Sequence, residues 1–129
     1  MGPLCYCGKR SCIETFLSGP GLRRDHFART GLDLLPQQIV EKARDGDAAC
    51  EETLALYDDR MARSLATVID IVDPDTIVFG GGLSNLERIY ANVPKLLPKY
   101  VFSDQVATKL VRAHHGDSSG VRGAAWLWK

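Results

Sequence analysis

The spacing of apolar residues predicts a mostly helical chain. Apolar positions recur every three or four residues, the period of an amphipathic helix, in five stretches: 13–17, 22–28, 36–44, 48–72 and 86–100. Ser18-Gly19-Pro20-Gly21 is expected to break the first two helices apart. Asp47 is placed to cap the longest helix. Asp73-Pro74-Asp75 should end it, because the residue before a proline avoids the helical conformation.

Only two stretches have the pattern of strands. Residues 76–79 form a short apolar run that leads into three glycines, and residues 107–113 alternate moderately. Pro94 and Pro98 should kink the helix expected over 86–100 or end it early. Asp117 or Ser118 is expected to cap a last helix over 119–127, whose small residues would allow close packing. Because two strands make a poor sheet, the pattern resembles the second half of an α/β domain whose first strands lie outside this chain.

Composition narrows the class of protein. The 129 residues suit one domain and contain 16 basic and 16 acidic side chains. That balance gives no reason to propose a nucleic-acid or membrane-surface partner, which would require a basic excess. No apolar run approaches the ~20 residues of a membrane span, and the start of the chain does not have the pattern of a signal peptide. We therefore expect a cytoplasmic protein with reduced thiols.

Three cysteines lie within eight residues, at Cys5, Cys7 and Cys12, with Gly8 to ease the turn between them. Soft thiolates gathered in one short loop favour zinc or an iron–sulfur cluster, and a three-cysteine loop favours zinc. Structural zinc normally takes four ligands, and the histidines of this chain, His26, His114 and His115, do not have convincing local spacing. Unligated thiols or two disulfides are the alternatives. The fourth cysteine, Cys50, is expected to be a buried, inert thiol.

Two other features could take part in ligand binding. Glu14 follows the cysteines and could accept hydrogen bonds from sugar hydroxyls, although a glutamate that favours the start of a helix explains it too. Gly80-Gly81-Gly82 joins a strand to a helix and would let backbone approach a nucleotide closely. A tight turn explains these glycines nearly as well, and the sequence contains no P-loop and no GxGxxG motif.

Together these residues resemble the C-terminal part of a ROK-family sugar kinase. The family's zinc signature, Cys-x-Cys-Gly-x-x-Gly-Cys-x-Glu, matches this chain from Cys5 to Glu14, except that Ser11 stands where the family usually has glycine. The resemblance extends over the rest of the chain. Three further segments are similar to the bacterial fructokinases of the family: Phe16 to Leu22, Asp73 to Gly82, and His115 to Trp128.

The resemblance implies a fold and a set of roles. It implies an α/β fold, a partial actin/hexokinase-like (ribonuclease H-like) C-terminal lobe over residues 1–129 that is mostly helical with about two strands. Its parts would be a zinc loop with sugar- and nucleotide-site segments (1–21), a helical region (22–72), and the part that holds the glycine-rich adenosine loop (73–129). Cys5, Cys7 and Cys12 would bind zinc with a histidine from upstream, and Glu14 would hydrogen-bond the sugar. The nucleotide would be bordered by Gly80, Gly81, Gly82, Leu83, Ser84, Gly19 and Pro20.

The implied reaction is the phosphorylation of D-fructose at its 6-hydroxyl by ATP with magnesium. The resemblance places the aspartate base in an N-terminal lobe outside this chain, so the chain alone is expected to be inactive. A homodimer, or association between copies of the chain, is also expected. Two alternatives stay open: another ROK hexose or N-acetylhexosamine kinase, and a ROK-type sugar-responsive transcription repressor.

Overall fold

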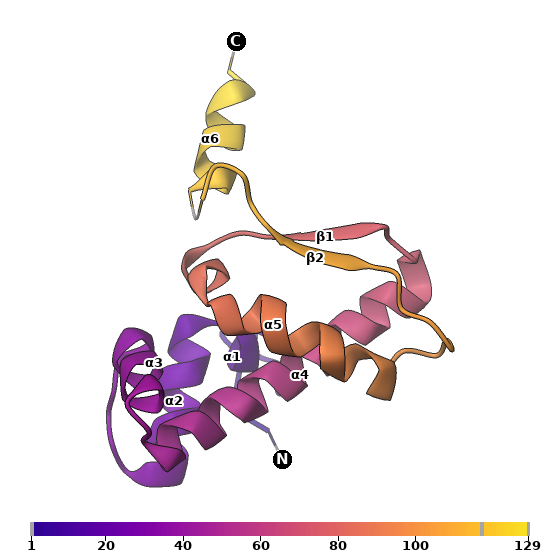
Figure 1. The fold of residues 1–129 in the computed structure, drawn as a ribbon. Coiled ribbons are helices and arrows are strands. Elements are labelled where there is room, and N and C mark those ends of the chain that lie inside the picture. The colour runs from indigo at the N-terminus through magenta and orange to yellow at the C-terminus, as the bar shows by residue number, and fades with distance from the viewer. Residues whose placement is uncertain (1, 117, 129) are drawn as a thin grey trace. The chain divides into compact units, whose positions relative to one another are not determined.

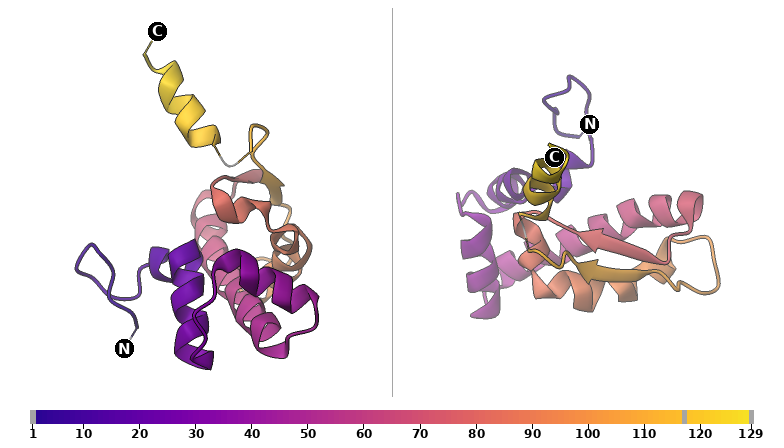
Figure 2. Two further views of the ribbon diagram at one scale, coloured as in Figure 1. Left: turned by 90° about the vertical axis from the view of Figure 1, so that its left-hand side faces the viewer. Right: turned by 90° about the horizontal axis from the view of Figure 1, so that it is seen from above.

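A computed structural model describes residues 2–116 and 118–128, and it divides the chain into two compact units, Met1–Met61 and Ala62–Lys129. Figures 1 and 2 show the ribbon. The α-helices are α1 (Glu14–Leu17), α2 (Gly19–Thr30), α3 (Pro36–Arg44), α4 (Ala48–Val72), α5 (Glu87–Leu96) and α6 (Ser119–Trp126). Two short 3₁₀ helices, η1 (Gly82–Asn85) and η2 (Leu97–Lys99), and two strands, β1 (Thr76–Phe79) and β2 (Lys109–Arg112), complete the described elements.

The helix α2 begins three residues earlier than predicted. Only Ser18 is extended, with φ −104° and ψ 164°, and its Oγ accepts a hydrogen bond from the N–H of Gly21 at 3.0 Å. The first turn of a helix tolerates Pro20, because the N–H groups there have no partner within the helix. The expected break over Gly19-Pro20-Gly21 is therefore wrong, since the capping serine separates α1 from α2 by itself.

Buried residues of α2, α3 and the first half of α4 form the core of the first unit. They include Leu22, Ile39, Leu54 and Tyr57, each at most 2% exposed. The capping role of Asp47 is confirmed, because its Oδ1 accepts a hydrogen bond from the N–H of Cys50 at 2.9 Å.

A buried polar pair lies within the same core. His26 Nδ1 lies 2.9 Å from the hydroxyl oxygen of Thr53, which itself donates to the carbonyl of Ala49. Because the threonine hydroxyl has only one proton to donate, His26 Nδ1 is the donor in this pair.

The second unit contains a two-stranded parallel sheet with one covered face. Thr76 pairs with Lys109 and Phe79 with Arg112, and Figure 1 shows α5 on one side of the strands. The Phe79 ring meets the Tyr90 ring of α5 with centroids 5.9 Å apart. On the other face Val78 is 60% exposed. The prediction of two strands is confirmed, with β2 shorter than the expected 107–113.

Two further expectations concern the later helices. The helix that contains Pro94 ends at Leu96, short of Tyr100, as the prolines predicted. The close packing expected of α6 is not seen in the described residues, where a Cβ built at Gly120 or Gly123 would meet no atom within 4 Å. Asp117, an expected cap, lies outside the described residues. Among the described helices, none combines the length and the apolar composition of a membrane span.

Candidate metal and ligand site

Backbone hydrogen bonds fold residues 3–11 into a loop that turns back on itself. The N–H of Cys5 donates to the carbonyl of Lys9 at 2.8 Å, and the N–H of Ser11 donates to the carbonyl of Pro3 at 2.9 Å. Gly8, with φ +81°, provides the left-handed residue that such a tight turn needs. Cysteines on both arms of the loop are therefore brought together.

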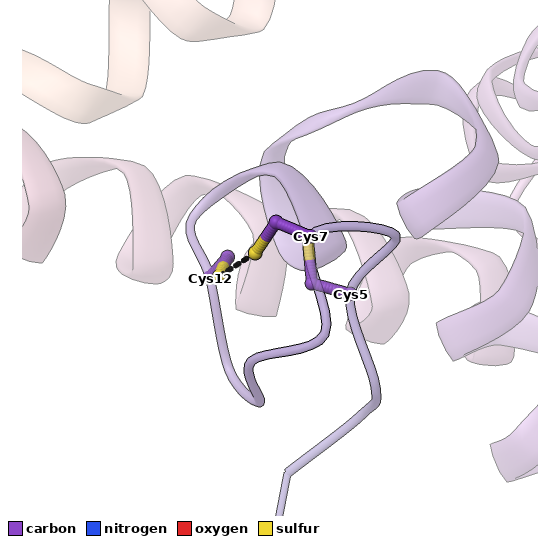
Figure 3. Close-up of side chains that lie close together, drawn as sticks. All are labelled: Cys5, Cys7 and Cys12. Atoms are coloured by element: carbon purple, nitrogen blue, oxygen red, sulfur yellow. Dashed lines mark hydrogen bonds between the residues drawn. The ribbon is translucent and has the colours of Figure 1, made fainter.

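The three sulfur atoms of this loop form one cluster. They lie within 4.8 Å of one another, and Cys7 Sγ lies 3.5 Å from Cys12 Sγ (Figure 3). A tetrahedral zinc ion with Zn–S bonds of about 2.3 Å holds its sulfurs about 3.8 Å apart. Small side-chain rotations would reach that spacing, so the three residues fit as ligands of a soft metal ion.

The same contacts shift the pKa values of two of the thiols in opposite directions. A backbone hydrogen bond involving Lys9, followed by the contact with Cys12, lowers the pKa of Cys7. The hydrogen bond between the two sulfurs raises the pKa of Cys12 to about 11, because a thiol that donates to its neighbour keeps its proton. The thiolate is the metal-binding form, and the lowered pKa of the exposed Cys7 favours it.

No histidine joins the cluster among the residues that the structure describes. His26 is fully buried beside Thr53. His114 and His115 belong to the second unit, where the centroids of their rings lie 4.9 Å apart. All four cysteines are free thiols. Cys50 is buried as predicted, and burial raises the pKa of its thiol.

Glu14, the predicted sugar ligand, is the first residue of α1, directly after the metal loop. Its side chain is exposed, whereas its backbone is fixed, because its carbonyl accepts a hydrogen bond from the Ser18 hydroxyl at 2.7 Å. A carboxylate on a fixed backbone and open to solvent is suited to accept hydrogen bonds from hydroxyl groups.

Gly19 and Pro20, predicted to border a nucleotide, line a cavity of about 440 Å³ within the first unit. The other side of this cavity is formed by Asp33, Leu35 and the first two residues of α3, Pro36 and Gln37. A two-pronged ion pair fixes that side, since Arg23 Nε donates to Asp33 Oδ1 at 2.6 Å and a terminal nitrogen of Arg23 bonds the other oxygen. The hydrogen bond to Arg23 lowers the pKa of Asp33.

The second predicted nucleotide segment, Gly80 to Ser84, follows β1 in the second unit. Gly81 has φ +81°, so its turn requires a left-handed residue. A Cβ at Gly80 or Gly82 would meet no atom of the described residues within 4 Å, so packing does not require glycine there. The expected turn explains Gly81, and neither packing nor a positive φ requires glycine at the other two positions. Ser84 is buried, and its hydroxyl donates to the Gly81 carbonyl at 2.6 Å.

Sequence reasoning missed two residues that support the metal loop and the start of α1. The hydroxyl of buried Thr15 donates to the carbonyl of Cys12 at 2.6 Å, and Arg24 donates to the carbonyl of Thr15 at 3.0 Å. A threonine three residues after a cysteine at a helix start was a usable sign of the first bond. The second joins residues nine apart and depends on how α2 packs.

Comparisons with known proteins show what this chain is similar to. The N-acetyl-D-glucosamine kinase of Vibrio parahaemolyticus serotype O3:K6 (strain RIMD 2210633) is 37% identical over 123 residues, which are 95% of this chain and 41% of that protein. The chain thus spans less than half the length of this curated relative.

Solved structures show the same fold. A ROK family glucokinase from Streptomyces griseus, in complex with glucose and AMPPNP, superposes with a TM-score of 0.84 at 25% identity, over 98% of this chain and 47% of that one. A ROK family transcriptional regulator, a homologue of the E. coli MLC protein, superposes with a TM-score of 0.70 at 23% identity, over 86% of this chain and 31% of that one. At this identity the likeness shows the fold alone. The predicted partial lobe of the actin/hexokinase-like fold is confirmed.

The sequence model of the ROK family matches residues 1–129, the whole chain. The zinc signature, the fold and this match lead to one conclusion: the chain belongs to the ROK family.

Proposed function

We propose that this chain is the C-terminal part of an ATP-dependent sugar kinase, which transfers the terminal phosphoryl group of ATP to a sugar hydroxyl. The observation that carries the proposal is the 37% identity, over nearly the whole chain, to a kinase of N-acetyl-D-glucosamine. Since the chain spans 41% of that relative, the activity belongs to the whole protein, and the 129 residues alone should be inactive.

Two sugars are candidates for the substrate. The relative named above is a kinase of N-acetyl-D-glucosamine, which supports that sugar and does not support the fructose assignment made from the sequence segments. The segments Phe16 to Leu22, Asp73 to Gly82 and His115 to Trp128 resemble fructokinases, which keeps D-fructose as the second candidate. The regulator shares only the fold, so it gives no support for a role in DNA binding.

Each part of the proposed site has a role in this function. Glu14 accepts hydrogen bonds from the sugar. Gly19, Pro20 and the segment Gly80 to Ser84 are the residues that we propose for the nucleotide. Magnesium bound with ATP would neutralise phosphate charge during transfer. The proposed compartment is the cytoplasm, where thiols stay reduced, and the enzyme would work as a homodimer.

The substrate test uses the full-length enzyme with N-acetyl-D-glucosamine, D-fructose, D-glucose and D-mannose. We expect kcat/KM for one of the first two sugars to exceed the other three by about 10-fold or more. Glu14→Ala should raise the KM of that sugar by about 10-fold, because a charged hydrogen-bond acceptor is lost. Glu41→Gln, on an exposed face of α3, is the matched control. Phosphorylation of none of the four sugars would refute the proposal.

We also infer that Cys5, Cys7 and Cys12 hold a structural zinc ion that fixes the loop before Glu14. The test is the zinc content of the purified chain and of four single Cys→Ser variants. We expect Cys5→Ser, Cys7→Ser and Cys12→Ser to lower the zinc content, whereas Cys50→Ser, a thiol buried elsewhere, should match the wild type. Equal zinc content in all four variants would show that the cluster is not the site.

A further inference from the structure

Thr15 is the buried residue directly after Glu14, in the first turn of α1. Its side chain is 5% exposed, whereas Glu14 beside it is exposed. The hydroxyl of Thr15 donates to the carbonyl of Cys12 at 2.6 Å, and the backbone N–H of Thr15 donates to the same oxygen at 2.8 Å. A buried hydroxyl is costly unless it is hydrogen-bonded. The peptide group that follows Cys12 is therefore held by two donors from one residue.

The carbonyl of Thr15 contacts the first turns of α2. It accepts a hydrogen bond from Arg24 at 3.0 Å. It also lies so close to Gly21 that a Cβ there would come within 2.7 Å of the oxygen. Backbone thus packs directly against backbone at this point. Because Gly19 and Pro20 begin the same helix, Thr15 links the metal loop to the wall of the cavity that they line.

Glu14 lies on the turn that these contacts fix. On one side its neighbour Thr15 is bonded to Cys12. On the other side the Ser18 hydroxyl donates to the Glu14 carbonyl at 2.7 Å and accepts from the N–H of Gly21 at 3.0 Å. Any shift of the Cys12 backbone would therefore move the residue that carries the Glu14 carboxylate.

We propose that Thr15 is a positioning residue whose hydroxyl holds Cys12 in place for the metal and, through the same turn, sets the direction of the Glu14 carboxylate. The proposal rests on the metal and sugar roles proposed above. The hydroxyl bonds the Cys12 backbone and acts on both groups only through it. A threonine that merely stabilised the start of α1 would contribute to folding without changing metal affinity.

Three variants of the full-length protein separate these two roles. Thr15→Val removes the hydroxyl and keeps the branched shape, and Thr15→Ser restores the hydroxyl. Thr30→Val is the matched control, because the Thr30 hydroxyl donates to the His26 carbonyl at 2.8 Å at the other end of α2. The measured quantity is the Zn²⁺ dissociation constant, by competition with a chromophoric chelator, together with the Tm of each variant.

We expect Thr15→Val to weaken zinc binding by about 10-fold or more, as the loss of a residue that supports a metal ligand does. Thr15→Ser should restore the affinity. Thr30→Val should lower the Tm by a similar amount and leave the affinity unchanged. In the full-length enzyme, Thr15→Val should raise the sugar KM more than it lowers kcat.

Two results would overturn the positioning role while the metal site stands: equal zinc affinity in Thr15→Val and Thr30→Val, or no recovery in Thr15→Ser. A wild-type full-length protein that takes up no zinc would refute the metal site and the positioning role together. Activity of the full-length enzyme on sugars is measured separately, so failure of the proposed kinase function would be distinguishable from either result.

Discussion

Ser11 has a backbone conformation that favours glycine. Its φ is +60°, in the left-handed region, which costs a residue with a Cβ about 1–2 kcal/mol. Ser11→Gly should therefore raise the free energy of unfolding by up to about 1 kcal/mol, because the greater freedom of glycine in the unfolded chain offsets part of the gain. Urea denaturation measures the change. Ser11→Ala keeps the Cβ and should show no gain, and a loss of stability in Ser11→Gly would contradict the strain.

The residues of the site differ in how far the sequence could predict them. The cysteine cluster was predictable, because a short loop keeps its ligands close whatever the rest of the fold does. The strained position was predictable too, since Ser11 replaces a glycine of the signature. Thr15 had a local sign that was missed, whereas the bond of Arg24 was not predictable, because it joins residues nine apart and depends on how α2 packs against α1.

At the scale of helices, Gly21 and Gly123 should respond oppositely to the same substitution. Alanine in a helix interior is normally about 1 kcal/mol better than glycine. A Cβ at Gly21 would lie 2.7 Å from the Thr15 carbonyl oxygen, so Gly21→Ala should instead destabilise by about 1–3 kcal/mol. Gly123→Ala meets open space and should raise helix content. Circular dichroism with thermal melting compares the two, and a stabilised Gly21→Ala would exclude the close backbone contact.

The cap of α4 should make stability depend on pH. The hydrogen bond from the backbone of Cys50 lowers the pKa of Asp47 below its ordinary value of 3.8. A carboxyl with a lowered folded-state pKa contributes stability above its unfolded pKa and loses it as the pH falls through the folded value. The Tm should therefore decrease as the pH is lowered below about 4.

Asp47→Asn tests this contribution separately from the cap itself, because asparagine caps a helix nearly as well and does not titrate. Its Tm should fall less steeply than that of the wild type between pH 5 and about pH 2. Asp33, whose pKa Arg23 lowers, titrates in both proteins and so cancels in the comparison. Identical pH profiles would show that Asp47 does not contribute.

Helix periods and breakers predicted most elements because each depends on nearby residues. The long helix α4, its cap at Asp47 and its end before Pro74 follow from local chemistry. The start of α2 was wrong because Gly19-Pro20-Gly21 has the composition of a turn, while a serine cap in front of a proline also begins a helix. The close packing expected of α6 needed a partner, and a sequence pattern does not identify one.

At the scale of the whole molecule, the chain has features that favour association between copies. In the described part, each strand of the two-stranded sheet pairs on one side only, which leaves backbone groups at both edges. Val78 and Val111, which pair in register, are 60% and 36% exposed on the uncovered face. The 16 basic and 16 acidic side chains cancel, so net charge does not keep copies apart.

We therefore expect the apparent mass of the chain to rise with concentration in light scattering. Val78→Lys should reduce that rise, because it places a charge at the centre of the exposed sheet face, whereas Val121→Lys, on the exposed helix α6, is the matched control. A constant monomer mass over the concentration series would show that the chain does not self-associate. Equal effects of the two variants would mean that association does not involve the sheet face. Association that only Val78→Lys weakens would identify this face as the contact.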